Sequence, residues 1–306
     1  GTGGGLLLAG VLVGVLLLTR RPVARRVAVV AAVAAVLGAL PVRLVASGWP
    51  PAGWIVVACS VGQGDAVVLS LAAGRAVVVD AGPDPGAVDG CLNRLRVRAV
   101  PLLVVTHFHA DHVGGIAGVF RGRAVGQVVT TPWLDPVAGR ALVHETAAAN
   151  HVPIREAAAG WAYAEGALHL TALGPLDRIS GSRSDPNNNS LVVLATQNGV
   201  RILLTGDAET EEQDGVLARY GTDGVRVDVL KVSHHGSPYQ DPAFLDAVDP
   251  RVALVSVGAG NSYGHPSPAV LDRLARGGAR VLRTDRDGDA AALITSGTLA
   301  VAAHPP

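Results

Sequence analysis

The chain has 306 residues, of which 49% are hydrophobic and only 16% are charged. This length permits one large α/β domain or two ordinary ones. Its 25 Lys and Arg residues balance 25 Asp and Glu residues, so the formal net charge is zero and no global basic field indicates a nucleic-acid partner. Any contact with DNA must therefore be local.

The hydrophobic excess is concentrated at the start of the chain. Residues 1–19 contain no charge, and a second apolar stretch covers residues 27–40. Each stretch is close to the roughly 20 residues that a helix needs to cross a bilayer. We expect two transmembrane helices within the hydrophobic region 1–47. A secretory signal or an apolar core helix would also explain the first stretch.

Four arginines lie between the two apolar stretches, in residues 20–26. The positive-inside rule keeps such a loop in the cytoplasm and sends both flanking ends to the outer side. The sequence thus predicts a cell-membrane protein whose remaining part lies on the extracytoplasmic side. There Cys59 and Cys91 could form a disulfide, and two buried free thiols explain them equally well. The chain starts at Gly1 and lacks methionine, which indicates a piece of a longer membrane protein.

Residues 48–53 form a turn-rich linker, and residues 54–306 form a separate domain of short valine-rich runs divided by turns. Such runs predict buried strands. Repeated strands followed by helices predict an α/β fold in which two sheets pack face to face with helices outside. Strands are expected at 54–59, 66–71, 76–80, 102–106, 167–171, 191–196, 200–205, 227–232, 252–257 and 290–294, and helices at 87–95, 113–120, 141–150, 209–220 and 268–276.

The run after the expected strand 102–106 contains four potential metal ligands, His107, His109, Asp111 and His112. The alternate residues His107 and His109 should point one way, and the chain then curls so that Asp111 and His112 face a neighbouring position. This spacing can serve two metal ions a few ångströms apart. Imidazole and carboxylate ligands without thiolate suit zinc, manganese or iron. The sequence therefore predicts a two-metal hydrolase site.

Further ligands are expected where later strands end. Asp207 follows the apolar run 203–205 and is expected to bridge the two ions, although a helix N-cap is the alternative. His234 and His235 follow the strand expected at 227–232. Adjacent residues at a strand end diverge, so only one of them should point easily at the same metal ion. We expect His234 to bind metal and His235 to bind substrate or protonate the leaving group.

The HxHxDH motif, the later aspartate after a glycine and the histidine after a strand resemble the metallo-β-lactamase superfamily. This resemblance implies an αββα sandwich with the site at one edge of the sheets, and it makes Asp80 a structural aspartate near the site. The superfamily's usual third-motif histidine is replaced here by an asparagine run. Asn187 or Asn188 would be a weak oxygen ligand there, unless the run is an ordinary turn.

Four further segments narrow the resemblance to the C-terminal domain of the ComEC/Rec2 competence proteins, which are membrane channels for DNA uptake. These segments are residues 61–66, 187–190, 233–237 and 261–266. Asp65 in the first is either a partner of the metal ligands or a turn residue. His265 in the last binds a phosphate, acts as a general acid, or is an ordinary loop histidine.

The family resemblance implies a nuclease that degrades single-stranded DNA at the outer face of the membrane. Two zinc or manganese ions would be its cofactors, with Asp111, His235 and His265 as catalytic residues. Its other partners would be further channel helices or competence proteins. The alternatives are a hydrolase of small phosphodiesters, lactones or thioesters, and a non-catalytic DNA-binding collar of the channel.

Overall fold

The computed structural model describes residues 23, 26, 30 and 48–305. Apart from Val30, the two expected transmembrane segments lie outside these residues, and no helix among the described ones is long and apolar enough to cross a membrane. The chain divides into two compact units after Gly48. The second unit, which begins at Trp49, carries the fold.

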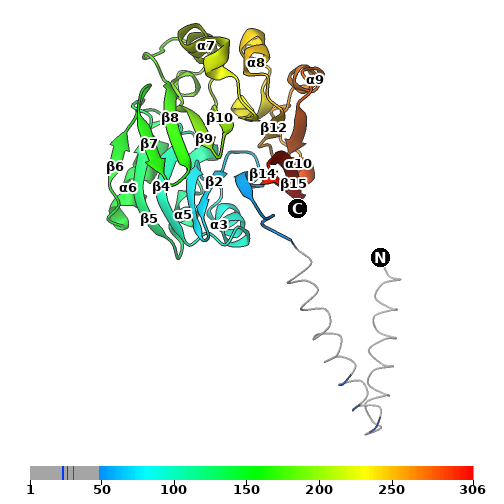
Figure 1. Cartoon of the computed structure of the whole chain (residues 1–306). Coiled ribbons are helices and arrows are strands. Elements are labelled where there is room, and N and C mark those ends of the chain that lie inside the picture. Colours follow the sequence, from blue (N-terminus) through cyan, green and yellow to red (C-terminus); the bar gives the residue numbers. More distant parts are fainter. Residues whose placement is uncertain (1–22, 24–25, 27–29, 31–47, 306) are drawn as a thin grey trace, which may run out of the picture. The chain divides into compact units, whose positions relative to one another are not determined.

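Two mixed β-sheets pack face to face in this unit (Figure 1). The first has the strand order β15-β14-β1-β2-β3-β4-β5-β6 and the second the order β13-β12-β11-β10-β9-β8-β7. Neighbours from β3 to β6 and from β10 to β13 are parallel, and the others are antiparallel. The strands are β1 Trp54–Ala58, β2 Val67–Ala72, β3 Arg75–Val79, β4 Ala99–Val105, β5 Ala124–Thr130, β6 Ile154–Glu156, β7 Ala162–Glu165, β8 Leu168–Gly174, β9 Val192–Gln197, β10 Val200–Leu204, β11 Val229–Lys231, β12 Val252–Val255, β13 Arg280–Arg283, β14 Asp289–Thr295 and β15 Thr298–His304.

Helices cover the outer face of each sheet. The first sheet is covered by α3 Pro85–Arg94, α5 Ile116–Phe120 and α6 Val137–Ala149, and the second by α7 Thr210–Val225, α8 Pro242–Val248 and α9 Pro268–Arg276. Short turns of helix lie at the strand ends: α4 Ala110–Val113, α10 Thr284–Asp287, and the 3₁₀ turns η1 Asn187–Asn189 and η2 Ser233–Gly236. The layers are those of an αββα sandwich, as the sequence predicted.

Apolar side chains form three buried layers, one between the sheets and one under each set of helices. Successive residues of one strand go to different layers. Val77 faces the other sheet and Val78 faces the helices, and in β10 Leu204 and Leu203 divide in the same way. A strand that is buried on both faces reads as a continuous apolar run, which is why these strands could be predicted.

The expected helix 113–120 is broken into α4 and α5. A β-carbon on Gly114 would lie 2.6 Å from the Pro83 carbonyl oxygen, and one on Gly115 would lie 2.0 Å from the Ala81 carbonyl oxygen. These two glycines let the chain pass directly over the segment after β3. The sequence also missed β5, β6, β7, β13 and β15, of which all but β5 are edge strands with weaker apolar patterns.

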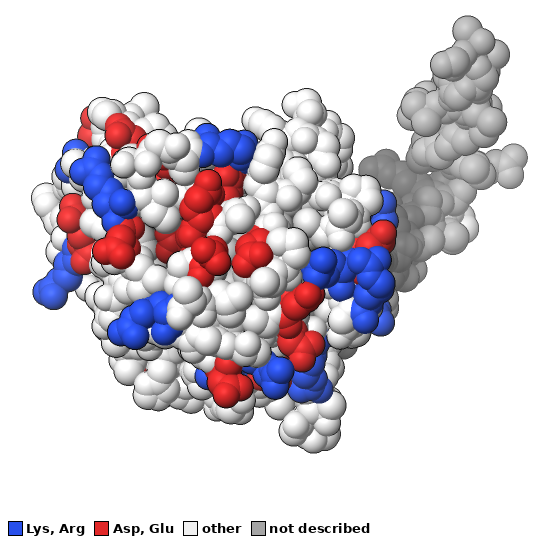
Figure 2. All heavy atoms as spheres, turned by 90° about the horizontal axis from the view of Figure 1, so that it is seen from above, with Lys and Arg blue, Asp and Glu red and all other residues white. Residues whose placement is uncertain are grey.

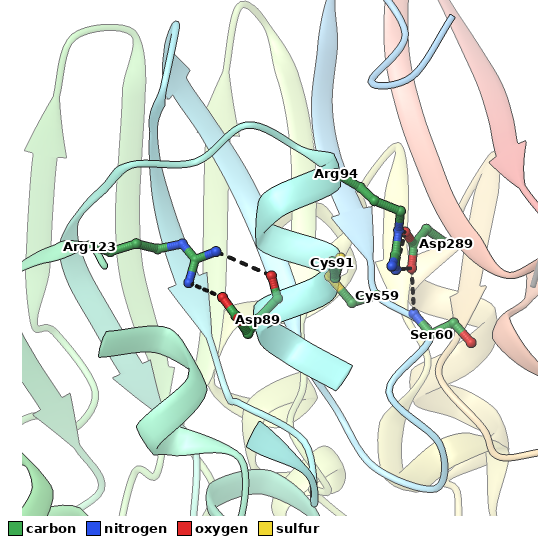
Figure 3. The surroundings of a disulfide bond; sticks show 7 residues. All are labelled: Cys59, Ser60, Asp89, Cys91, Arg94, Arg123 and Asp289. Atoms are coloured by element: carbon green, nitrogen blue, oxygen red, sulfur yellow. Dashed lines mark hydrogen bonds and ion pairs between the residues drawn. A yellow bond between two sulfur atoms is a disulfide. The ribbon is translucent and has the colours of Figure 1, made fainter. Parts of the chain in front are cut away.

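A disulfide joins Cys59, directly after β1, to Cys91 on α3 (Figure 3). The two residues are 32 positions apart. Beside the disulfide, Arg94 donates from Nε to Asp289 Oδ2 over 2.7 Å, and Asp289 Oδ1 accepts from the Ser60 amide over 2.8 Å. The disulfide and the ion pair between Arg94 and Asp289 together hold α3 against β1 and β14 of the first sheet.

Candidate metal centre

The predicted ligands meet where β3, β4, β10 and β11 end. Thr106, after β4, accepts from the Leu191 amide on the other sheet through its carbonyl oxygen, over 2.9 Å. Gly206, after β10, has φ of 51° and packs against Thr106, so a β-carbon there would lie 2.9 Å from Thr106 Cβ. The two sheets therefore bring the residues after their strands into one cluster.

One group of ligand atoms comes from Asp111, His112, Asp207 and His235, and these atoms all lie within 4.8 Å of one another. His112 Nε2 is 3.2 Å from Asp207 Oδ1. His235 Nε2 is 3.1 Å from Asp111 Oδ2 and 3.6 Å from Asp207 Oδ2. Two imidazoles and two carboxylates thus surround one point.

A second group of side chains also approaches Asp207. His107 Nε2 is 3.0 Å from His109 Nδ1 and 3.9 Å from Asp207 Oδ2. His234 Nε2 is 3.8 Å from the same carboxylate oxygen. Asp207 therefore contacts both groups, which is the position that a bridging carboxylate requires. Helix α7 is capped by another residue, Asn188, whose Oδ1 accepts from the Glu209 amide over 3.1 Å.

Both histidines after β11 reach the cluster, but they join different groups of ligand atoms. The strand already ends at Lys231, and His234 and His235 have left-handed φ angles of 46° and 54°. Alternation between two faces holds only in extended backbone, so the strand rule does not apply here. His235 belongs to the four-residue group and His234 to the group of His107 and His109.

Hydrogen bonds on the far side of the rings orient two of the histidines. Asp80, after β3, accepts from His112 Nδ1 over 2.8 Å and from the Thr106 amide over 2.8 Å. The Ser256 carbonyl accepts from His235 Nδ1 over 3.0 Å. In both rings Nε2 is therefore left to face the cluster, as is usual for metal-binding histidines. Asp80 therefore holds the His112 ring in position.

The donor atoms fit divalent metal ions. Buried Asp207 Oδ1 and His112 Nε2 have no hydrogen-bond partner among the described residues. Burial lowers the pKa of His107 well below its usual value and also lowers that of His109, which keeps both rings neutral. Burial raises the pKa of Asp207, but the nearby His112 and His235 outweigh it and hold this pKa well below its usual value. The neutral imidazoles of His107 and His109 beside the ionised carboxylate of Asp207 suit zinc or manganese. Burial lowers the pKa of His112 and His235, but the nearby carboxylates outweigh it and raise both, so a metal ion would replace a proton on each of these rings.

Lys231, the last residue of β11, is an unexpected part of the centre. Its side chain is buried, forms an ion pair with Asp65, and lies 3.8 Å from Asp207 Oδ1. Lys231 Nζ also donates to the Gly206 carbonyl over 2.8 Å. Burial raises the pKa of Asp65, but Lys231 and His235 outweigh this and lower it to about 2. Asp65 is thus an ionised partner of the centre.

Asn187 and Asn188, in the asparagine run, make different contacts. Asn188 is turned toward α7, where its Nδ2 also donates to Glu211 over 2.9 Å. Asn187 lines the cavity over the centre, its Nδ2 is 3.1 Å from Glu209 Oε1, and its buried Oδ1 has no hydrogen-bond partner among the described residues. Asn187 is therefore the residue placed to offer an oxygen ligand. Glu209, which is also 2.9 Å from His234 Nδ1, was missed by the sequence reasoning.

An open cavity of about 500 Å³ lies over the ligands. His265 lines it, with its ring centroid 5.2 Å from that of His234. Burial, with the charges of His234 and His235, lowers the pKa of His265 to about 4, so its imidazole is neutral at pH 7 in the metal-free protein. The cavity is lined by Gln63, Pro83, His109, Ala110, Asp111, Asn187, Asp207, His234, His235, Tyr263 and His265.

Comparison with known proteins agrees with this site. Residues 59–258 match the metallo-beta-lactamase superfamily. The chain is 32% identical to competence protein ComA of Neisseria gonorrhoeae over 74% of its length, and 31% identical to ComE operon protein 3 of Bacillus subtilis over 63%. These matches span only 30% and 24% of the two relatives.

The fold has a solved counterpart in Zn(2+)-bound PqqB from Methylobacterium extorquens, with a TM-score of 0.51 and 14% sequence identity. The alignment covers 75% of this chain and 98% of that one. A likeness at this identity supports the fold alone. The match over residues 59–258 shows that the chain belongs to the metallo-β-lactamase superfamily, with a domain related to those of the competence proteins.

Proposed function

We propose that this domain is a two-metal phosphodiesterase that degrades single-stranded DNA. The observation that carries the proposal is the position of Asp207, between two groups of ligands on the floor of an open cavity. Relatives named as competence proteins supply the substrate class. The chain matches only part of those relatives, so DNA as substrate is a proposal for this domain.

In the proposed site, His107, His109 and His234 would hold one ion, with the Asn187 side-chain oxygen as a weak further ligand. Asp111, His112 and His235 would hold the other, and Asp207, which is near both groups, would serve both. This assignment moves His235 from a purely catalytic role to a ligand, because its Nε2 lies among the four converging ligand atoms. When bound, two divalent ions activate water and neutralise the charge of a phosphodiester.

The protein's own groups perform the remaining tasks. His265, neutral at pH 7, is placed in the cavity wall to accept a proton from the attacking water. Lys231 lies beside the buried carboxylate of Asp207, and Asp80 accepts a hydrogen bond from the buried imidazole of His112. These two contacts hold the carboxylate and the imidazole in position. The substrate's phosphate would lie in the cavity between His109, His234 and His265.

We further propose that the domain works on the extracytoplasmic side of a cell membrane. The arginines between the two apolar stretches of residues 1–47 support this orientation. The disulfide between Cys59 and Cys91 supports it independently, because such bonds persist in oxidising compartments.

Figure 2 shows acidic and basic side chains interspersed on the face drawn there, without a continuous basic surface. The remaining channel helices or other competence proteins would be partners.

The proposal is tested with the full chain purified in detergent and given manganese or zinc. A linear single-stranded oligonucleotide, bis-p-nitrophenyl phosphate and a lactone are compared as substrates. We expect DNA cleavage that is lost in His109→Ala and kept in His144→Ala, which removes an exposed histidine on α6. DNA cleavage that survives in His109→Ala would contradict the site, and turnover of the lactone alone would favour a small-molecule hydrolase. A metal-free, inactive protein would indicate a DNA-binding collar.

A further inference from the structure

A second cavity, of about 210 Å³, lies beside the candidate metal centre. Its walls include Trp133, Leu134, Leu176 and Arg178. The 3₁₀ turn η1 separates the two cavities, because its first residue lines the metal cavity and its last residue, Asn189, lines this one. Only the three residues of η1 therefore separate the two cavities.

Hydrogen bonds hold the second cavity in place relative to the metal centre. Trp133 follows β5, whose last residue Thr130 pairs with Val105 at the end of β4, just before the first metal ligands. Thr131 Oγ1 donates to the Asn189 carbonyl over 2.6 Å and accepts from the Trp133 amide over 3.2 Å. The tryptophan is therefore fixed to the same turn that carries Asn187.

The chemistry of the second cavity is that of a stacking site. The Trp133 side chain is buried, and its indole Nε1 has no hydrogen-bond partner among the described residues. The Arg178 guanidinium lies 4.6 Å from the centroid of the Trp133 ring, and Leu134 is exposed at the cavity's rim. The cavity therefore presents an arginine stacked on an aromatic ring, with an apolar residue at its rim.

The loop between β8 and η1 carries two arginines, one near each cavity, and also Asp177 and Asp185. Arg178 lies at the tryptophan, and Arg183 pairs with Glu209 and lies 3.6 Å from the centroid of the Tyr239 ring, beside His234. Arginine is well suited to contacts with phosphates. A strand that has one phosphate over the metal cluster could therefore contact both arginines with its neighbouring phosphates.

We propose that the second cavity binds one nucleobase of a single-stranded DNA substrate, a base close in sequence to the phosphate that is cleaved. The inference rests on the proposed function and names a base-binding subsite for it. A guanidinium held over an aromatic ring offers a flat, cationic surface that matches the face of a nucleobase. A paired base is stacked within its duplex, so a base that enters such a pocket comes from a single strand.

The test uses the full chain and a series of thymidine oligonucleotides, each with one abasic nucleotide at a different position. In the wild-type protein, one abasic position should lower kcat/KM by about 5- to 150-fold, the usual effect of removing one base–aromatic contact. In Trp133→Ala this penalty should disappear at that position only, and cleavage of the intact strand should fall by a similar factor. A merely structural role would lower cleavage of every oligonucleotide equally and leave the positional profile unchanged, which would overturn the proposal.

Two further variants keep the result interpretable if Trp133→Ala folds poorly. Trp133→Phe retains an aromatic ring and removes the N–H, so it should keep most of the positional penalty. Arg178→Ala should weaken the penalty, and Arg155→Ala, which removes an exposed arginine on β6, should not change it. The pocket would be excluded if the abasic penalty were the same in Trp133→Phe, Arg178→Ala and Trp133→Ala as in the wild-type protein.

A binding measurement separates this proposal from the proposed nuclease activity. The dissociation constant of the same labelled oligonucleotides is measured by fluorescence anisotropy in EDTA, where no cleavage occurs. Position-dependent binding that requires Trp133, without any cleavage on adding metal, would sink the nuclease and retain the base pocket. Cleavage with a flat abasic profile in both proteins would retain the nuclease and sink the pocket.

Discussion

Lys231→Met is expected to destabilise the domain strongly, although lysine substitutions are usually mild. Met has a similar length and is apolar, so the change removes the ammonium group with little loss of volume. It leaves the carboxylate of Asp65, which is 1% exposed, without its ion-pair partner. It also removes the donor to the Gly206 carbonyl. The perturbation is therefore almost purely electrostatic.

The expected loss follows from these contacts. Removing one partner of a buried ion pair costs about 3–5 kcal/mol, because the remaining charge stays buried. The lost hydrogen bond to Gly206 adds about 1 kcal/mol. His235, whose Nδ1 is 3.4 Å from Asp65 Oδ1, compensates part of this. We expect a net loss of about 3–5 kcal/mol, a large fraction of the stability of an ordinary domain.

The measurement is urea denaturation of the metal-free full chain, followed by tryptophan fluorescence. Lys231→Met and Asp65→Asn are studied singly and together, since the double variant leaves no buried charge from this pair and should lose less than the sum of the two. Arg75→Met is the control, because it breaks an exposed ion pair with Glu165 and should hardly move the midpoint. Additive losses, or a Lys231→Met midpoint no lower than that of Arg75→Met, would refute the reasoning.

Three other changes test the fold and the centre. Replacing both Cys59 and Cys91 with alanine should lower the free energy of unfolding by about 4 kcal/mol, from the entropy of the loop that the disulfide closes. Thermal denaturation with and without a reductant measures this, and a wild-type protein indifferent to the reductant would contradict it. Asn187→Ala should weaken binding of a divalent metal about 10- to 100-fold. Asn188→Ala should instead lower the free energy of unfolding by about 1 kcal/mol, because it removes a helix cap. Metal titration and urea denaturation of both variants check this, and metal binding that is weakened by Asn188→Ala but not by Asn187→Ala would contradict it. In the metal-free protein, burial lowers the pKa of His235, but the carboxylates of Asp207 and Asp65 raise it to about 9. Its stabilising effect is thus complete below pH 6.5 and lost as pH rises through 9, by at most about 3 kcal/mol. Unfolding curves at several pH values should show this fall, and a His235→Gln protein with the same pH dependence would argue against it.

The ligands that the sequence identified share one property, which is a local signal. His107 to His112 are contiguous in sequence, and Asp207 and His234 each follow an apolar run that reads as a strand. The ends of such strands could be placed near one another from the expected sandwich alone. The buried strands were predicted for the same reason, because burial on both faces leaves an unbroken apolar run.

What was missed depends on contacts between distant residues. The partner of Lys231 lies on a loop before β2, in the other sheet, and no periodicity links the two. Lys231 is the chain's only lysine and interrupts an apolar strand directly before the two histidines, a signal that could have marked it as buried. Asn187 and Asn188 could not be distinguished, since successive residues of a 3₁₀ turn point about 120° apart and the phase of the turn is set by its neighbours.

The left-handed backbone of His234 and His235 bears on why this loop has its sequence. Residues with a β-carbon pay a conformational penalty there, of about 1 kcal/mol or more each. Glycine would adopt the same angles freely, as Gly236 does with φ of 78°. Selection for folding alone would therefore favour glycines before Gly236. Two consecutive imidazoles in this conformation indicate that the loop gives up stability for chemistry, so a search for more stable variants would begin by erasing the site.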